Sequence, residues 1–189
     1  MSIKGEIMAR KETIGKDYLI DTAFLLAKEE GFGSVTARKL AAAAGCSTQP
    51  IFRLYENMED LWKDVYVRAV EYFGSFYDSF PKNNLEPFVD LGMAYISFAN
   101  VEPELFKLLF MGHKGEYVKS LYEILNGDVG NVAAEFKKAK LYGVYDSQDL
   151  FTKMWIFING IACMTITGDY DLDEKQTLEL LKKTLRAFK

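Results

Sequence analysis

Residues 36–61 read TARKLAAAAGCSTQPIFRLYENMEDL, and this stretch contains the starts of three helices. Thr36 carries a side-chain oxygen that can cap the first helix, and Gly45 has the backbone freedom that a left-handed helix end requires. Ser47 or Thr48 can cap a second helix directly after the turn. The stretch therefore predicts two short helices joined by a tight turn and followed by a third helix.

The second of these helices has an inner and an outer face. Pro50 falls in its first turn, where a missing backbone N–H costs little, and Ile51 with Leu54 can face a core. The small residues Ala41 to Ala44 let the two helices cross closely. Such a pair forms a helix-turn-helix, whose second helix can enter the major groove of DNA. Ordinary helical hairpins share this spacing, so the pattern alone leaves both interpretations open.

Several short motifs surround this pair of helices. They are Gly31-Phe32 at the end of a first helix, Thr36 and Leu40-Ala41 in the next, Ala44-Gly45-Cys46-Ser47 at the turn, Ile51-Phe52 and Tyr55 in the following helix, and Leu61 beyond it. With these motifs, residues 14–61 resemble the DNA-binding domain of TetR-family (tetracycline-repressor-like) regulators. The resemblance implies a homodimer that binds a pseudo-palindromic operator in double-stranded DNA.

The resemblance also implies which residues touch DNA. They lie at the start of one helix and on the exposed face of the next: Thr36, Arg38, Ser47, Thr48, Gln49, Pro50, Phe52, Arg53 and Tyr55. Their chemistry suits this role, because arginine binds phosphate or guanine edges and glutamine pairs bidentately with adenine. Serine and threonine donate to phosphates or bases, and apolar groups contact thymine methyls.

Charge gives weaker support for DNA binding. Residues 1–63 contain nine Lys or Arg and nine Asp or Glu, so this part of the chain is neutral, whereas a basic domain would be stronger evidence. Met58 stands where the family commonly has a phosphate-binding lysine. These observations keep an alternative open, namely a helical ligand-binding or interaction module without specific DNA binding.

The composition predicts an all-α fold. The chain has 189 residues, is 49% hydrophobic and contains only four prolines, and its apolar residues recur at helical spacing. We expect about nine helices, with a three-helix helix-turn-helix domain at residues 1–60 and a helical effector-binding and dimerisation domain at 61–189. The expected helical segments, ten when every break is counted separately, cover residues 14–31, 36–44, 48–54, 57–80, 86–100, 103–112, 116–125, 128–142, 148–167 and 173–188.

The second domain resembles one branch of the same family. The run Pro103 to Phe110 is similar to a short helix of that branch, and Trp155 with Asn159-Gly160 resembles its Trp-His-Gly motif. The resemblance implies a four-helix dimer interface made by the last two helices of each chain, in which Gly160 and Ala162 allow close approach. The expected apolar contacts are Phe151, Ile158, Ile161, Leu178, Leu181 and Leu185.

The family places a small-molecule effector among the same helices. Aromatic residues are dense here, although an aromatic at helical spacing more often packs a core than lines a pocket. The candidates for effector contacts are Tyr66, Phe73, Tyr77, Tyr95, Phe98, Phe106, Phe110, Tyr122, Trp155 and Asn159. The implied function is a transcriptional repressor that the effector releases from its operator.

The sequence contains few features that indicate other classes of function. The apolar run from Lys153 to Asp169 is too short and too polar for a membrane span, so it predicts a buried helix. Cys46, Cys163 and His113 lie far apart, which argues against a metal site. No nucleotide-binding or hydrolase motif is present, so we expect no enzyme activity and no cofactor. The charged N-terminus lacks a secretory signal, which predicts a cytoplasmic protein.

Overall fold

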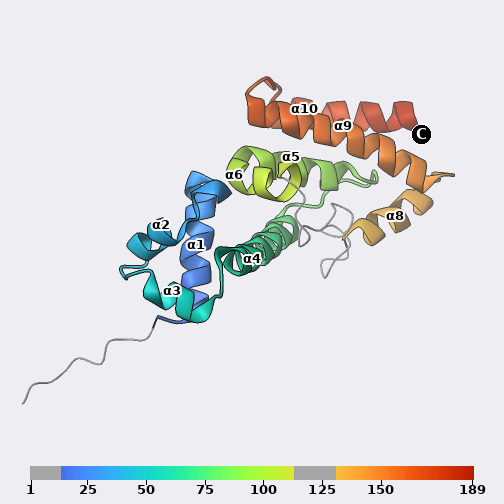
Figure 1. Ribbon diagram of the computed structural model, residues 1–189. Coiled ribbons are helices and arrows are strands. Elements are labelled where there is room, and N and C mark those ends of the chain that lie inside the picture. Colours follow the sequence, from blue (N-terminus) through green and yellow to red (C-terminus); the bar gives the residue numbers. More distant parts are fainter. Residues whose placement is uncertain (1–13, 113–130) are drawn as a thin grey trace, which may run out of the picture.

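The computed structural model describes residues 14–112 and 131–189, which form helices and no strand (Figure 1). The elements are α1 (Lys16–Glu30), a 3-10 turn η1 (Phe32–Ser34), α2 (Ala37–Ala43), α3 (Gln49–Leu54), α4 (Met58–Ser79), α5 (Val89–Val101), α6 (Pro103–Phe106), a π-helical turn η2 (Lys107–Met111), α8 (Asn131–Leu141), α9 (Ser147–Thr167) and α10 (Glu174–Phe188). The all-helical prediction is confirmed. The helix expected at 116–125 lies outside the described residues.

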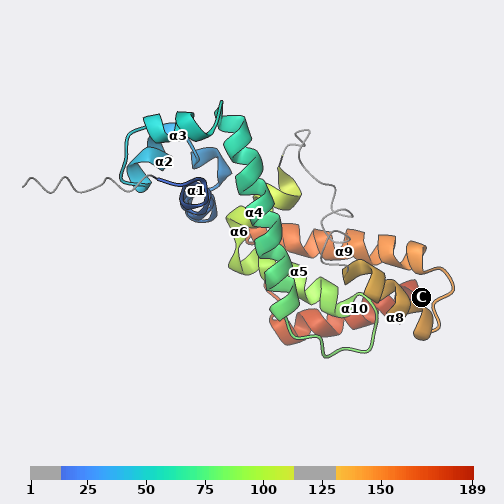
Figure 2. The same cartoon turned by 90° about the horizontal axis from the view of Figure 1, so that it is seen from below.

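Two hydrophobic clusters organise these helices. The first cluster joins α1, α2 and α3 to the start of α4, where Leu61 and Val65 are fully buried. The second joins the rest of α4, including Tyr66 and Phe73, to α5, α6, α8, α9 and α10. Figure 2 shows α4 running from the group of α1 to α3 toward the C-terminal helices. Because α4 belongs to both clusters, the domain boundary between residues 60 and 61 stays a prediction.

Polar side chains fix the starts of the long helices. The Asn57 side-chain oxygen accepts a hydrogen bond from the Asp60 backbone N–H at 3.0 Å, as expected for the cap of α4. The Asp146 carboxylate accepts from the first turn of α9, and Asp173 forms a capping box with Gln176 at the start of α10. These local contacts explain why the sequence-based helix boundaries lie close to the observed ones.

Helix α5 is the centre of the C-terminal part and packs against α9 and α10. Gly92 allows this close approach, because a Cβ atom there would lie 2.8 Å from Ile158 Cδ1. Gly160, which was predicted to allow close approach at a dimer interface, is exposed and has open space beside its Cα, so that role stays a prediction. Helix α9 is long and apolar enough to cross a membrane by length and composition alone. One face of this helix packs against α5 and α10.

A buried polar network joins α1 to the junction of α5 and α6. The Lys28 ammonium donates to Glu102 Oε1 at 2.6 Å and to the Tyr72 hydroxyl at 2.8 Å. Tyr72 also donates to Glu102 Oε1 at 2.6 Å, and Glu102 is buried. Burial lowers the pKa of Lys28, but its bonds to Glu102 and Tyr72 outweigh this effect, so the pKa is raised. The network therefore ties the N-terminal helices to the C-terminal ones.

Candidate DNA-binding site

The pair of helices α2 and α3 begins and turns largely as the sequence predicts. Thr36 caps α2 by accepting a hydrogen bond from the Lys39 backbone N–H at 3.3 Å. At the other end, Gly45 has a φ of 65°, and the N–H groups of Gly45 and Cys46 bond back to the carbonyls of Ala42 and Ala41. This is a Schellman helix end, which positions the chain for a sharp turn into α3.

The start of α3 differs in one detail from the prediction. Thr48 occupies the N-cap position, but its side chain makes no capping hydrogen bond, because its backbone is already helical. Pro50 lies in the first turn as expected. Ile51 is fully buried in the first hydrophobic cluster and Leu54 is half-buried against it, so the inner face of α3 is confirmed.

The outer face of α3 presents a compact set of side chains. Gln49, Pro50, Phe52 and Arg53 line one shallow depression in the surface, and the Phe52 ring is 52% exposed. The other predicted contacts from the cap of α2 to the turn are also exposed, namely Thr36, Arg38, Ser47 and Thr48. The structure thus brings eight of the nine predicted DNA-contacting residues to the surface.

The cations around this face divide into two groups. Lys39 is paired with Glu30 at 2.6 Å, and Lys63 is paired with Asp60 at 3.4 Å. Arg38 and Arg53 are exposed and form no ion pair with any residue that the structure describes. Although the domain is neutral overall, both uncompensated guanidinium groups belong to the predicted contact set. They suit an anionic partner such as DNA phosphate.

Tyr55 is the exception among the predicted contacts. It is only 5% exposed, and its hydroxyl donates to Asp64 Oδ2 at 2.9 Å, so the structure places it in the core. Asp64 also pairs with Lys16 at 2.8 Å. Burial and the Asp64 carboxylate raise the pKa of Tyr55 well above its ordinary value of 10.0. Tyr55 therefore fixes the end of α3 against α1 and α4 and is not an exposed DNA contact.

The sequence did not identify Asp64 and Lys16 as residues that join α1 and α4 next to Tyr55. Asp64 lies in the second turn of α4 and Lys16 is the first residue of α1, so they are 48 positions apart. Charged residues at such positions ordinarily read as solvated helix surface. No local pattern distinguishes this pair from exposed charges, and only the crossing of α1 and α4 brings it together.

The predicted effector contacts lie mainly inside the second cluster. Tyr66, Phe73, Tyr77, Tyr95, Phe98 and Phe106 are buried, whereas Phe110, Trp155 and Asn159 are half-buried. The Tyr95 ring packs against Phe110 and Trp155 with centroid distances of 4.8 and 4.6 Å, and its hydroxyl donates to Asn159 at 3.0 Å. Tyr122 lies outside the described residues. These side chains pack on one another, so their contact with an effector stays a prediction.

The predicted dimer contacts need correction. Phe151, Ile158, Ile161, Leu181 and Leu185 are buried in the second cluster of their own protomer, and Leu178 is half-buried against it. The first five side chains fill the space among α5, α9 and α10 and are not available to a partner chain. The apolar surface of α9 is formed by Ile156, which is 68% exposed, and Met164, which is 45% exposed, with the exposed Gly160 between them.

Comparisons with known proteins agree with this geometry. Residues 19–65 match the sequence model of the family described as bacterial regulatory proteins, tetR family. The whole fold is similar to a solved structure from Vibrio parahaemolyticus, described as that of a candidate transcriptional regulator of the TetR family, with a TM-score of 0.68 and 18% sequence identity. That likeness covers 90% of this chain and 96% of the other. No curated protein sequence matches the chain. Residues 19–65 therefore form a helix-turn-helix domain of the tetR family of bacterial regulatory proteins, and the chain as a whole has the fold of the Vibrio parahaemolyticus structure.

Proposed function

We propose that the protein is a cytoplasmic, dimeric repressor that binds a pseudo-palindromic operator and leaves it when a small-molecule effector binds the C-terminal helices. The observation that carries the proposal is the outer face of α3, where exposed Gln49 and Phe52 stand beside the unpaired Arg53. Such a face combines base-reading and phosphate-binding groups on a helix narrow enough for the major groove.

Each exposed group of this face has a distinct task in the proposal. Gln49, in the first turn of α3, pairs with an adenine edge, and Phe52 contacts a thymine methyl. Arg53, one turn later, binds a guanine edge or a phosphate. Arg38 on α2 binds the backbone and sets the register of the domain on the duplex.

A second copy of the chain completes the proposed DNA-binding surface. Ile156, Gly160 and Met164 lie four residues apart along α9, so they form one exposed stripe on a single helix face. We place the two-fold axis at this stripe, because a small residue flanked by apolar ones permits close packing of two helices. The dimer then sets the separation of its two α3 helices, and with it the spacing of the operator half-sites.

The decisive experiment is selection of bound sequences from a random duplex pool. We expect a palindromic consensus, and we expect Gln49→Ala and Arg53→Ala each to weaken binding to it by about 1–3 kcal/mol without unfolding the protein. Lys183→Ala is the matched control, because Lys183 is an exposed cation on α10, remote from α3 in sequence and in the fold. Unchanged affinity in both variants would contradict the proposal that α3 contacts the bases of the operator.

The neutral charge of residues 1–63 favours the second candidate, a helical module without specific DNA binding. The same selection distinguishes the two functions. A specific regulator enriches one palindrome and keeps its preference at moderate salt, whereas a non-specific binder enriches no sequence and loses affinity steeply as salt rises.

A further inference from the structure

We propose that a cleft between α5 and α10 binds an organic cation with an apolar body. The cleft has a volume of about 450 Å³ and is lined by Phe80, Met93, Ile96, Ser97, Asn100, Thr165, Tyr170, Leu172, Asp173, Glu174 and Thr177. This volume lies within the range of small-molecule sites, about 300–1,000 Å³. None of the residues predicted from the sequence to contact an effector takes part in the lining, so this is a separate candidate site.

The apolar wall of the cleft is made by four side chains from three parts of the chain. Phe80 follows α4, Met93 and Ile96 come from α5, and Leu172 comes from the α9–α10 connection. Leu172 is 41% exposed, so apolar surface remains open to solvent here. An uncharged portion of a ligand would cover this surface and remove it from water.

The unpartnered polar side chains of α5 lie at this cleft. The helix has four side chains with polar groups, Asp90, Tyr95, Ser97 and Asn100, and the Tyr95 hydroxyl donates to Asn159. Asp90 is held by Asn84 and Lys138 at the start of the helix. Ser97 and Asn100 make no side-chain hydrogen bond with any described residue, and both line the cleft one helical turn apart. They offer unused donors and acceptors to a ligand.

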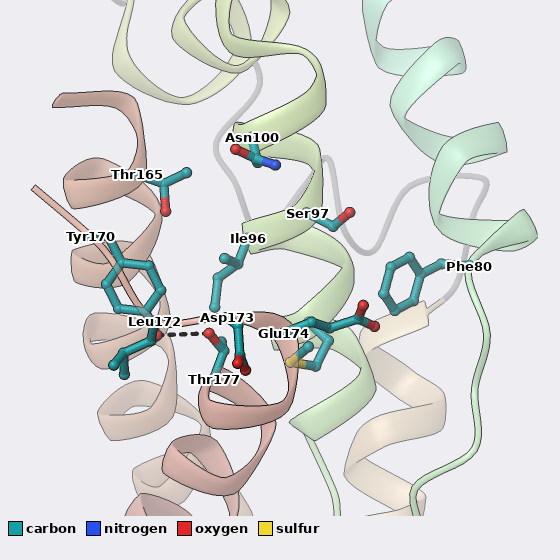
Figure 3. Close-up of a pocket in the computed structure, with 11 residues that line it drawn as sticks. Phe80, Ile96, Ser97, Asn100, Thr165, Tyr170, Leu172, Asp173, Glu174 and Thr177 are labelled. Carbon is teal, nitrogen blue, oxygen red and sulfur yellow. Dashed lines mark hydrogen bonds between the residues drawn. The ribbon is translucent and has the colours of Figure 1, made fainter. Parts of the chain in front are cut away.

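The charge of the cleft is negative. Its lining includes the Asp173 and Glu174 carboxylates and no lysine or arginine, and Asp169 and Asp171 precede them in the same connection. Asp173 Oδ1 accepts from the Gln176 N–H as the helix cap. Glu174 forms no ion pair or hydrogen bond within the described part of the chain, and Figure 3 shows its carboxylate pointing across the cleft toward Phe80. An apolar wall opposite an uncompensated carboxylate is complementary to an amphiphilic cation.

The arrangement favours an organic cation over a metal ion. Asp169, Asp171 and Asp173 alternate along the chain, but no three Asp, Glu, His or Cys side chains of the described residues converge closely enough to hold a metal. Asp169 accepts from Thr167, and Asp173 serves as a cap, so their oxygens are directed elsewhere. One partly exposed carboxylate beside apolar side chains suits an ammonium group attached to a hydrocarbon.

The cleft is also connected to the DNA-binding helices. Asn100, in its lining, lies two residues before Glu102, which receives the hydrogen bonds of Lys28 and Tyr72. A ligand that shifts the last turn of α5 therefore acts on the contact between α5 and α1. The identification of the cation as the effector rests on the proposed function, whereas its binding in the cleft does not.

The test is calorimetric titration of the DNA-free protein with decyltrimethylammonium, and with decyl sulfate as an anion of the same chain length. We expect the cation to bind with one site per chain and the anion to bind at least tenfold more weakly. Glu174→Gln lowers the affinity for the cation about three- to fivefold, as expected for a partly exposed charge pair. Asp173→Asn/Glu174→Gln lowers it further, while retaining an acceptor that can cap α10.

Glu179→Gln is the matched control, because it removes the same charge from α10 at an exposed position outside the cleft. It leaves the affinity unchanged. Equal binding of cation and anion, or equal loss in the Glu174→Gln and Glu179→Gln proteins, overturns the proposal. Binding of the cation to the monomer but not to the dimer, measured by sedimentation, also overturns the proposal, because a second copy of the chain would then occupy the cleft. Because no DNA is present, failure here is independent of the operator selection.

Discussion

At the scale of single residues, the DNA-binding unit depends on a polar contact behind its exposed face. Tyr55 and Lys16 both bind the Asp64 carboxylate, so the end of α3, the start of α1 and the second turn of α4 meet at one group. The exposed side chains of α3 can read a base only if the helix itself is held at a fixed angle. Positioning residues and contacting residues are therefore different sets here.

Tyr55→Phe separates these two roles. The variant loses the hydrogen bond to Asp64 and keeps the buried ring, so we expect about 1 kcal/mol less stability toward urea and a smaller loss of operator affinity than in Arg53→Ala. The raised pKa of Tyr55 means that its stabilisation is present below pH 10.0, the ordinary tyrosine value, and is lost as the pH rises above it. An operator affinity as low as that of Arg53→Ala would indicate direct DNA contact by Tyr55.

At the scale of elements, α9 and α10 show why residue faces are harder to predict than helices. Their starts are marked by local signals, such as the Asp173 capping box, and were predicted closely. The inner face of α9 was not predicted correctly, because this helix carries apolar residues on all sides. Ile156 is exposed, whereas Ile158, two positions later, is buried. Periodicity gives a unique inner face only when the outer face is polar.

The exposed stripe of α9 and the buried face of α10 predict different results for two charge substitutions. Ile156→Glu places a carboxylate on the exposed stripe of α9, so we expect a folded monomer in sedimentation that binds the operator weakly. Leu181→Glu places it at a fully buried position, so we expect an unfolded or strongly destabilised chain by circular dichroism. A folded, fully dimeric Ile156→Glu protein would place the interface elsewhere.

At the scale of the whole molecule, the contacts between distant parts were invisible to sequence reasoning. Lys28 and Glu102 are 74 positions apart, and neither belongs to a motif. The fold class and the two crossed helices follow from local caps, turns and spacing, whereas the nine predicted DNA contacts came from the family resemblance, and eight of them lie at the surface. The networks that join the parts follow only from how the helices cross, which one sequence does not specify.

Lys28→Met tests whether this long-range contact holds the two hydrophobic clusters together. Among the described residues, the substitution leaves the buried Glu102 carboxylate with Tyr72 as its one side-chain partner. We expect a loss of about 1–3 kcal/mol in urea unfolding, since Lys28 is partly exposed. Adding Glu102→Gln should recover part of this loss. Lys39→Met, which breaks the exposed pair with Glu30, is the control and should cost less than about 1 kcal/mol. Equal losses in the two lysine variants would contradict the role of the network.

Helix α4 contributes to both hydrophobic clusters without a break, so a movement at one of its ends is transmitted to the other. Its 22 residues span about 33 Å at the usual rise of an α-helix. Phe80, which follows its last turn, lines the cleft, whereas its first turns pack beneath α3. A rigid tilt of about 5° at the Phe80 end displaces the opposite end by about 3 Å, the length of a hydrogen bond. Under the proposed function, such a tilt is large enough to lift α3 from the base edges when α1, α2 and α3 move together with the start of α4.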